Sequence, residues 1–221
     1  MTEALAVTRY TLSVHTPAPE GAVFRIAVAA DLHNRSGDAA LAAIAREKPD
    51  CVVIAGDLIE SCRPSELMER EMQGDLRQYS AGKRWLMRTV IRADAVLGGA
   101  RRDSFDPENR KGFAFLQSAV RLAPVYYGLG NHEQYLSPQT KAQIRQTGAT
   151  LLENASVPLQ TALGKLHMGA LTTLPDRKWL SSFCALSGLK VLICHHPEYF
   201  ERFLDDQPLT LVLAGHAHGG Q

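Results

Sequence analysis

Hydrophobic residues gather in five short runs that are rich in β-branched side chains. Each run is shorter than a typical helix and is followed at once by glycine, aspartate or histidine, a pattern typical of a buried strand. We therefore predict five strands, each ending at a polar segment. The runs are Val23–Ala30, Cys51–Ala55, Pro124–Leu129, Lys190–Cys194 and Thr210–Ala214.

The segment between the first two runs has a helical pattern. Its apolar positions in the range Leu41–Ala45 follow the helical period, with Ser36 or Asp38 as the expected cap and Pro49 as the stop. This order of strand, helix and strand predicts a parallel pair with a right-handed crossover.

Three further segments have recognisable periods. Ser137–Gly148 is expected to be a helix, and Pro197–Leu204 a short amphipathic helix. The stretch Ala149–Leu171 alternates and predicts antiparallel strands that turn at Gly164.

All five predicted strands deliver polar side chains to one edge of the fold. Six of the eight histidines lie in these segments, and ligands of open α/β sheets bind at the carboxyl ends of the strands. Each motif alone is a common turn, but their joint occurrence at five strand ends is not expected by chance. The segments are Asp31-Leu32-His33, Gly56-Asp57, Gly130-Asn131-His132-Glu133, His195-His196 and Gly215-His216-Ala217-His218.

These residue types suit a particular chemistry. Imidazole nitrogens and carboxylate oxygens bind divalent first-row metals, and two cations about 3.5–4 Å apart can clamp a phosphoryl group and lower the pKa of a bridging water. The resulting hydroxide attacks phosphorus. We therefore predict a hydrolase of phosphate esters with two divalent ions, most readily Mn²⁺, with Fe, Zn, Co or Ni as alternatives.

The order DxH, GD, GNHE, H and GHxH, which runs from Asp31 to His218, resembles the calcineurin-like metallophosphoesterases. Within that superfamily, the segments GHAHGGQ, LLENASV and FRIAVAADLH resemble the YkuE-like branch, whose members include enzymes that cleave the pyrophosphate of UDP-diacylglucosamine. The resemblance implies an α/β fold with two packed mixed β-sheets flanked by helices.

The resemblance also implies a role for each residue. His195 is preferred to His196 because it stands two positions before Pro197, although the strand pattern alone leaves the two open. The implied ligands are Asp31, His33 and His218 for the first metal, Asn131, His195 and His216 for the second, and Asp57 as the bridge, with His132 as an acid that binds no metal.

The chain departs from the branch in three places. Asn34 follows the first motif where the branch has a smaller or apolar residue, so we expect it to shape the substrate pocket. The chain stops at Gln221, so C-terminal strands are expected to be missing after 221. The strand at Thr210–Ala214 should then have an exposed edge or pair with another copy.

The third departure is a helical insertion at residues 61–112. We expect helices at Pro64–Ser80 and Lys83–Leu97, followed by a third beyond Gly98–Lys111. Because both ends of the insertion adjoin the metal-binding motifs, a surface helix is one reading and a lid over the site is the other. As a lid, it would bring the guanidinium groups of Arg84, Arg88 and Arg92 to an anionic substrate.

Composition narrows the remaining choices. We expect a single domain over residues 1–221, and a net charge of +1 argues mildly against nucleic acid and an Mre11-like nuclease. A non-catalytic scaffold on the same fold is the other alternative, and retention of every motif histidine argues against it. We find no membrane-spanning run or signal peptide, so we expect a cytoplasmic protein, with peripheral membrane association left open. The expected partner is a small-molecule or lipid-linked phosphate, and the oligomeric state is open.

Overall fold

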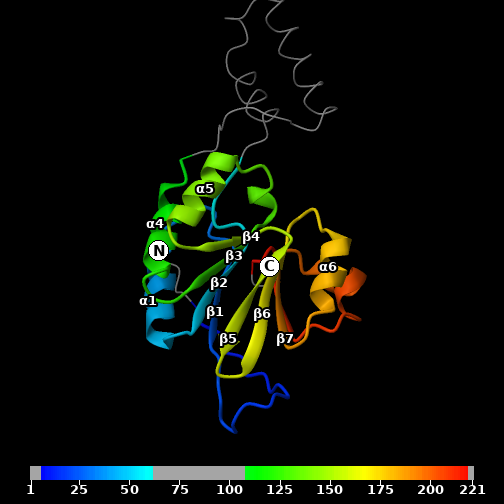
Figure 1. Ribbon diagram of the computed structural model, residues 1–221. Helices are drawn as coiled ribbons and strands as arrows, with labels where there is room; N and C mark the ends of the chain where they lie inside the picture. The colour runs from blue at the N-terminus through cyan, green and yellow to red at the C-terminus, as the bar shows by residue number, and fades with distance from the viewer. Residues whose placement is uncertain (1–5, 62–107, 219–221) are drawn as a thin grey trace, which may run out of the picture.

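The computed structural model describes residues 6–61 and 108–218, which form two packed β-sheets flanked by helices (Figure 1). The first sheet is parallel throughout these residues, in the order β1-β2-β3-β4. Its strands are β1 (Ile26–Ala29), β2 (Cys51–Ala55), β3 (Val125–Gly128) and β4 (Thr150–Leu152).

The second sheet is mixed, in the order β5-β6-β7-β8. A hairpin pairs β5 with β6 in antiparallel fashion, whereas β6 with β7 and β7 with β8 run parallel. Its strands are β5 (Ala155–Thr161), β6 (Gly164–Leu171), β7 (Leu189–Cys194) and β8 (Leu211–Leu213).

Helices cover the outer faces of both sheets. The first sheet packs against α1 (Asp38–Glu47), α4 (Arg110–Ala119) and α5 (Pro138–Gln146). The second sheet packs against α6 (Arg177–Cys184) and a π-helical turn, η3 (Phe200–Leu204). Among the described residues, no helix is long and apolar enough to cross a membrane.

Strand β2 shows how the sequence builds these layers. Its side chains alternate, so Val52 and Ile54 enter the core under the helices while Val53 and Ala55 enter the core between the sheets. Both faces are buried, which explains why the strand is an unbroken apolar run rather than an alternating one.

The prediction of an α/β fold with two packed sheets flanked by helices is confirmed, but only the second sheet is mixed, because the first is parallel throughout the described residues. Thr150–Leu152 was expected to join an antiparallel set, but it pairs in parallel with β3 and only β5 and β6 form the hairpin. The cap prediction for α1 was wrong, because Gly37 occupies that position without a side-chain cap and the Ser36 hydroxyl donates to Asp38 instead.

Two other expectations have a partial outcome. Most of the insertion, residues 62–107, lies outside the described residues, together with Arg84, Arg88 and Arg92. Its expected third helix corresponds to α4. Strand β8 ends the order of the second sheet within the described residues.

Candidate metal centre

The motif side chains meet at one edge of the fold. They lie in the segments that directly follow β1, β2, β3, β7 and β8. Histidine and carboxylate groups converge there in overlapping triplets whose candidate ligand atoms lie within 4.8 Å of one another. The four triplets are Asp31 with His33 and His218, His33 with Asp57 and His132, Asp57 with His195 and His216, and His196 with Glu198 and His216.

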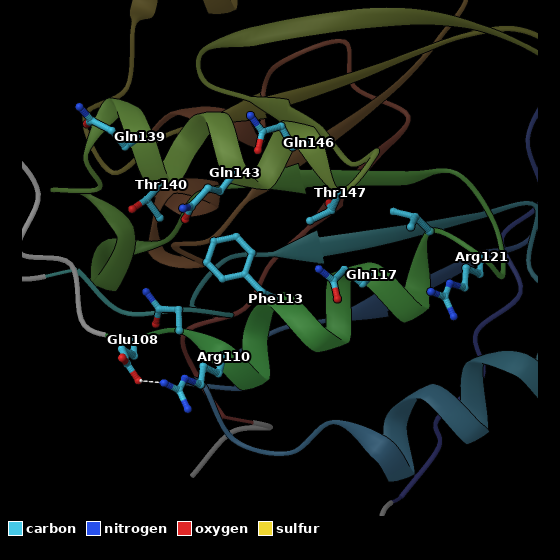
Figure 2. Close-up of a pocket in the computed structure, with 12 residues that line it drawn as sticks. Glu108, Arg110, Phe113, Gln117, Arg121, Gln139, Thr140, Gln143, Gln146 and Thr147 are labelled. Atoms are coloured by element: carbon cyan, nitrogen blue, oxygen red, sulfur yellow. Dashed lines mark ion pairs between the residues drawn. The ribbon is translucent and has the colours of Figure 1, made fainter.

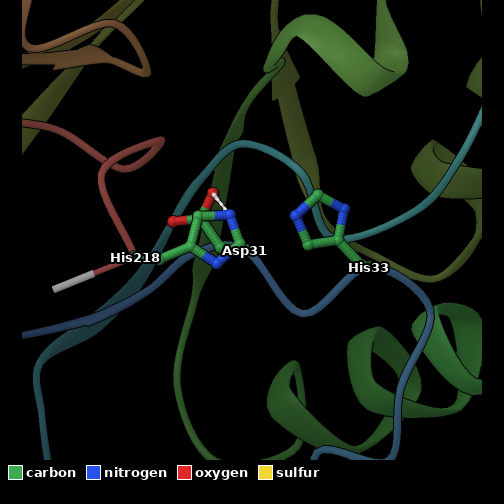
Figure 3. Close-up of side chains that lie close together, drawn as sticks. All are labelled: Asp31, His33 and His218. Carbon is green, nitrogen blue, oxygen red and sulfur yellow. Dashed lines mark ion pairs between the residues drawn. The ribbon is translucent and has the colours of Figure 1, made fainter. Parts of the chain in front are cut away.

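The first triplet joins the segment after β1 to the segment after β8. Figure 3 shows the His218 ring beside the Asp31 carboxylate, with His33 close by. His218 Nε2 lies 3.9 Å from Asp31 Oδ1, and the His33 and His218 rings stack with their centroids 5.3 Å apart. Asp31 also holds the backbone in place, because its carboxylate accepts a hydrogen bond from the His216 amide.

The third triplet contains His195, whose ring is almost fully buried. Its Nδ1 donates to the Ala55 carbonyl at 2.7 Å, which turns Nε2 towards the site. There Nε2 lies 3.1 Å from Asp57 Oδ2 and 3.1 Å from Asn131 Oδ1. His195 Nε2, Asp57 Oδ2 and Asn131 Oδ1 can each coordinate a cation, and His195 Nε2 lies close to both of the oxygen atoms.

Asp57 belongs to both the second and the third triplet. Its Oδ2 atom is 3.1 Å from His195 Nε2 and 4.0 Å from His33 Nε2, so one carboxylate faces ligands of both sets. Burial raises the pKa of Asp57, but the hydrogen bond and charge of His195 outweigh it and hold the pKa below its usual value. Asp57 is therefore kept ionised, as a bridging ligand must be.

The site fits divalent cations by its donor chemistry. Two carboxylates, one amide oxygen and several imidazoles crowd together, and oxygen and nitrogen donors of this kind suit Mn²⁺, Fe²⁺ and Zn²⁺. Burial lowers the pKa of His195, yet its bonds to Asp57 and Ala55 and nearby negative charge raise it overall. The centre thus attracts positive charge, which a cation can supply in place of a proton.

Backbone strain concentrates in the same segments. Eight non-glycine residues of the described chain have positive φ angles, and six of them belong to the motifs or adjoin them. Such conformations cost free energy and persist where the surrounding structure enforces them, commonly at functional sites. The six are Asp31, His33, Asn34, Asp57, His216 and His218.

Two motif glycines allow the segments to approach closely. A Cβ atom on Gly130 would stand 2.1 Å from Asp57 Oδ1, and one on Gly56 would stand 2.4 Å from His195 Nδ1. Any side chain at either position would therefore displace a residue of the centre, which explains the glycine in each motif.

Glu60 is a site residue that sequence reasoning missed. Its Oε2 atom accepts a hydrogen bond from His132 Nδ1 at 2.7 Å. Its Oε1 atom accepts one from His33 Nδ1 at 2.9 Å. Burial lowers the pKa of His132, but the Glu60 hydrogen bond and the charges of Asp57 and Glu60 raise it overall. His132 Nε2 is left facing the centre, 3.9 Å from Asp57 Oδ2.

Glu133 was also missed, and it organises the loop that carries Asp57. Its side chain is fully buried and accepts five hydrogen bonds. Burial raises the pKa of Glu133, and hydrogen bonds from several of these donors lower it. The effect of burial is the larger, so the pKa lies above its usual value. The donors are the amides of Asp57, Leu58, Ile59 and Gly130 and the hydroxyl of Tyr127.

The two adjacent histidines have different surroundings, and both belong to candidate metal-binding groups, His196 with Glu198 and His216. His195 faces Asp57 and Asn131, whereas His196 Nδ1 lies 3.1 Å from Glu198 and Nε2 lies 3.2 Å from the Thr173 hydroxyl. The assignment of the second metal's histidine to His195 rather than His196 stays a prediction.

The side chain of Asn34 is committed to the backbone. Its Nδ2 donates to the Glu108 carbonyl and its Oδ1 accepts the amides of Lys111 and Gly112 at the start of α4. These bonds attach the loop after β1 to α4, and the predicted contact of Asn34 with substrate stays a prediction.

A hollow of about 750 Å³ lies elsewhere, between α4 and α5 (Figure 2). Phe113, Gln117 and Gln143 are among its lining residues, and none of the predicted metal ligands is. Its location on the outer face of the first sheet gives no reason to assign it to the metal centre.

Comparison with known proteins agrees with the geometry. The sequence model of the calcineurin-like phosphoesterase family matches residues 24–220, and the chain belongs to this family. A short segment is similar to "Uncharacterized protein YpbG" of Bacillus subtilis (strain 168), with 46% identity over 35 residues. That match covers 16% of this chain and 14% of the YpbG protein. The family and the histidine–carboxylate clusters together support a metal-dependent phosphoesterase.

Proposed function

We propose that this chain hydrolyses phosphate esters with two divalent cations held on either side of Asp57. The observation that carries the proposal is the convergence of two histidine–carboxylate triplets on that one buried residue. Asp31, His33 and His218 would hold one cation, and His195, His216 and Asn131 would hold the other. When bound, the cations would neutralise phosphate charge and lower the pKa of a nucleophilic water.

The protein's own groups supply the remaining steps. His132 is half exposed at the edge of the centre, with Nε2 directed to it, so it can donate a proton to the leaving oxygen. Glu60 holds Nδ1 of both His132 and His33, and so fixes the orientation of the acid relative to a metal ligand.

The substrate range includes phosphodiesters, pyrophosphates and phosphomonoesters on a small molecule or a lipid headgroup. Membership of the YkuE-like branch is part of the proposal, supported by the GHAHGGQ segment, and so is Mn²⁺ as the preferred metal, supported by the imidazole and carboxylate donors. A cytoplasmic location is likewise part of the proposal, supported by the buried free thiols of Cys51, Cys184 and Cys194.

The first test counts metal ions. We expect about two equivalents of Mn²⁺ per wild-type chain, and turnover of a chromogenic phosphodiester that a chelator abolishes and Mn²⁺ restores. Asp57→Asn should lose one or both ions because the bridge loses its charge, whereas Asp206→Asn, an exposed control, should keep both. Elemental analysis measures the content. Full metal content in Asp57→Asn would overturn the bridging role, and metal binding without turnover would indicate a scaffold.

The second test addresses Glu60. Glu60→Gln retains one acceptor oxygen, so one of the two imidazoles loses its partner, and we expect kcat to fall on the order of 10–100-fold. Because Glu60 raises the pKa of His132, its loss should move the alkaline fall in kcat to lower pH. Glu198→Gln removes the charge of a carboxylate that bonds another imidazole, His196, and should leave that profile in place. A Glu60→Gln profile identical to wild type would contradict the assignment.

A further inference from the structure

A second pocket, of about 380 Å³, opens at the same edge as the metal centre. It is formed where β3, β4 and β6 end, so the carboxyl ends of strands from both sheets contribute to it. A volume of this size accommodates a small organic group. Its lining residues are Leu129, Gly130, Gln134, Lys141, Glu153, Asn154, Thr172, Thr173 and Leu174.

Two links place this pocket beside the proposed reaction centre. Gly130 lines the pocket and directly precedes Asn131, whose Oδ1 faces His195. On the other wall, the Thr173 hydroxyl lies 3.2 Å from His196, and the His196 ring lies 4.8 Å from that of His216. A molecule whose phosphate lies at the metals can therefore extend a substituent into the pocket.

The polar groups of the pocket differ in their availability. Asn154 is fully engaged, since its amide bonds to Thr172, Leu174 and Asp176. The side-chain amide of Gln134 has no hydrogen-bonding partner within residues 6–61 and 108–218. Lys141 shares the Glu153 carboxylate with Arg145, which leaves one positive charge in excess.

The remaining walls are apolar. Leu129 lines the inner side, and Leu174 is two-thirds exposed although its side chain is large and hydrophobic. A group with hydroxyls for Gln134 and Lys141, and with C–H faces for the two leucines, matches this lining. A purely aliphatic group would offer no hydrogen bond to the Gln134 amide and would shield the Lys141–Glu153 pair from water without replacing that solvation.

We infer that this pocket binds the second substituent of the substrate phosphate and selects a hydroxyl-bearing group, such as a polyol or a sugar. The inference rests on the proposed function and deepens it. It implies that the preferred substrates are diesters or diphosphates that carry such a group, rather than simple monoesters. Lys141 and Gln134 are the specificity-determining residues.

The test compares two diesters that release the same leaving group, 2,3-dihydroxypropyl p-nitrophenyl phosphate and propyl p-nitrophenyl phosphate. For the wild type we expect KM to be on the order of tenfold lower for the dihydroxypropyl ester, the effect of one or two hydrogen bonds that involve a charged group. Lys141→Met and Gln134→Leu should each raise KM for the dihydroxypropyl ester towards the value for the propyl ester, so that the preference is lost.

Arg145→Met is the matched control. Arg145 and Lys141 both pair with Glu153, but only Lys141 lines the pocket, so the control variant should retain the preference. Equal KM values in the wild type, or an equal loss in Arg145→Met and Lys141→Met, would overturn the inference. If the wild type hydrolyses neither ester and also no phosphomonoester or pyrophosphate, the proposed function fails. Calorimetric binding of the dihydroxypropyl ester to wild type and Lys141→Met then decides the pocket separately.

Discussion

His132→Asn is expected to lower kcat on the order of 10²–10⁴-fold while the metal content stays at the wild-type value. The imidazole has its Nδ1 bonded to Glu60 and its Nε2 directed into the centre, an arrangement suited to donating a proton. Asparagine cannot make that donation. Because His132 Nε2 is also within reach of a cation beside Asp57, metal content is the deciding measurement.

The leaving group provides an internal control for this prediction. A substrate with a very acidic leaving alcohol needs no proton, so it should conceal much of the His132→Asn defect, whereas an alkyl leaving group should reveal it in full. His196→Asn removes another imidazole at the same edge and should change kcat little. Loss of bound metal in His132→Asn would make His132 a ligand instead, and an equal defect on both substrates would exclude proton donation.

The edge of the fold that carries the site was predictable because strand ends are local signals. Short apolar runs followed by Asp31, Asp57 or Asn131 identify both a strand and the point where it stops. Parallel pairing then places these residues together without any knowledge of long-range contacts. The resemblance to a known family added the division of ligands between two cations, which the strand pattern alone could not supply.

Glu60 and Glu133 were not predictable in the same way. Nothing in the segment Gly56–Glu60 indicates that Glu60 forms hydrogen bonds with His33 and His132. Those contacts depend on the conformation of the loop after β2. Glu133 belongs to a motif, yet a glutamate in a loop is ordinarily exposed, and its burial follows only from the packing of the loops after β2 and β3.

The errors in the fold have a similar origin. Thr150–Leu152 lies within the stretch Ala149–Leu171 whose overall alternation predicted antiparallel strands, and such a period cannot show which sheet a strand joins. Helix α6 was not predicted although its cap was readable, since Asp176 accepts the amides of Lys178 and Trp179. Its apolar face, with Leu180 and Phe183, covers the second sheet.

Glu133→Gln should cause the largest loss of stability among single changes at the site. The buried carboxylate accepts four amides and one hydroxyl, and an amide side chain would place its NH₂ group against at least two of those donors. Each buried donor left without a partner costs about 1–3 kcal/mol, so we expect a loss of roughly 3–5 kcal/mol. For a chain of this length that corresponds to a fall in Tm of about 10 °C.

The same change should also weaken metal binding, because Glu133 fixes the amide of Asp57 and its neighbours. Thermal unfolding followed by circular dichroism measures the Tm, and elemental analysis below that temperature measures the metal content. Glu47→Gln breaks an exposed ion pair with Arg9 and should melt close to wild type. A Glu133→Gln protein that melts with this control and keeps its metals would show that the five hydrogen bonds do not hold the Asp57 loop. A protein that melts at a lower temperature but still binds two ions would show that Glu133 contributes to stability and not to metal binding.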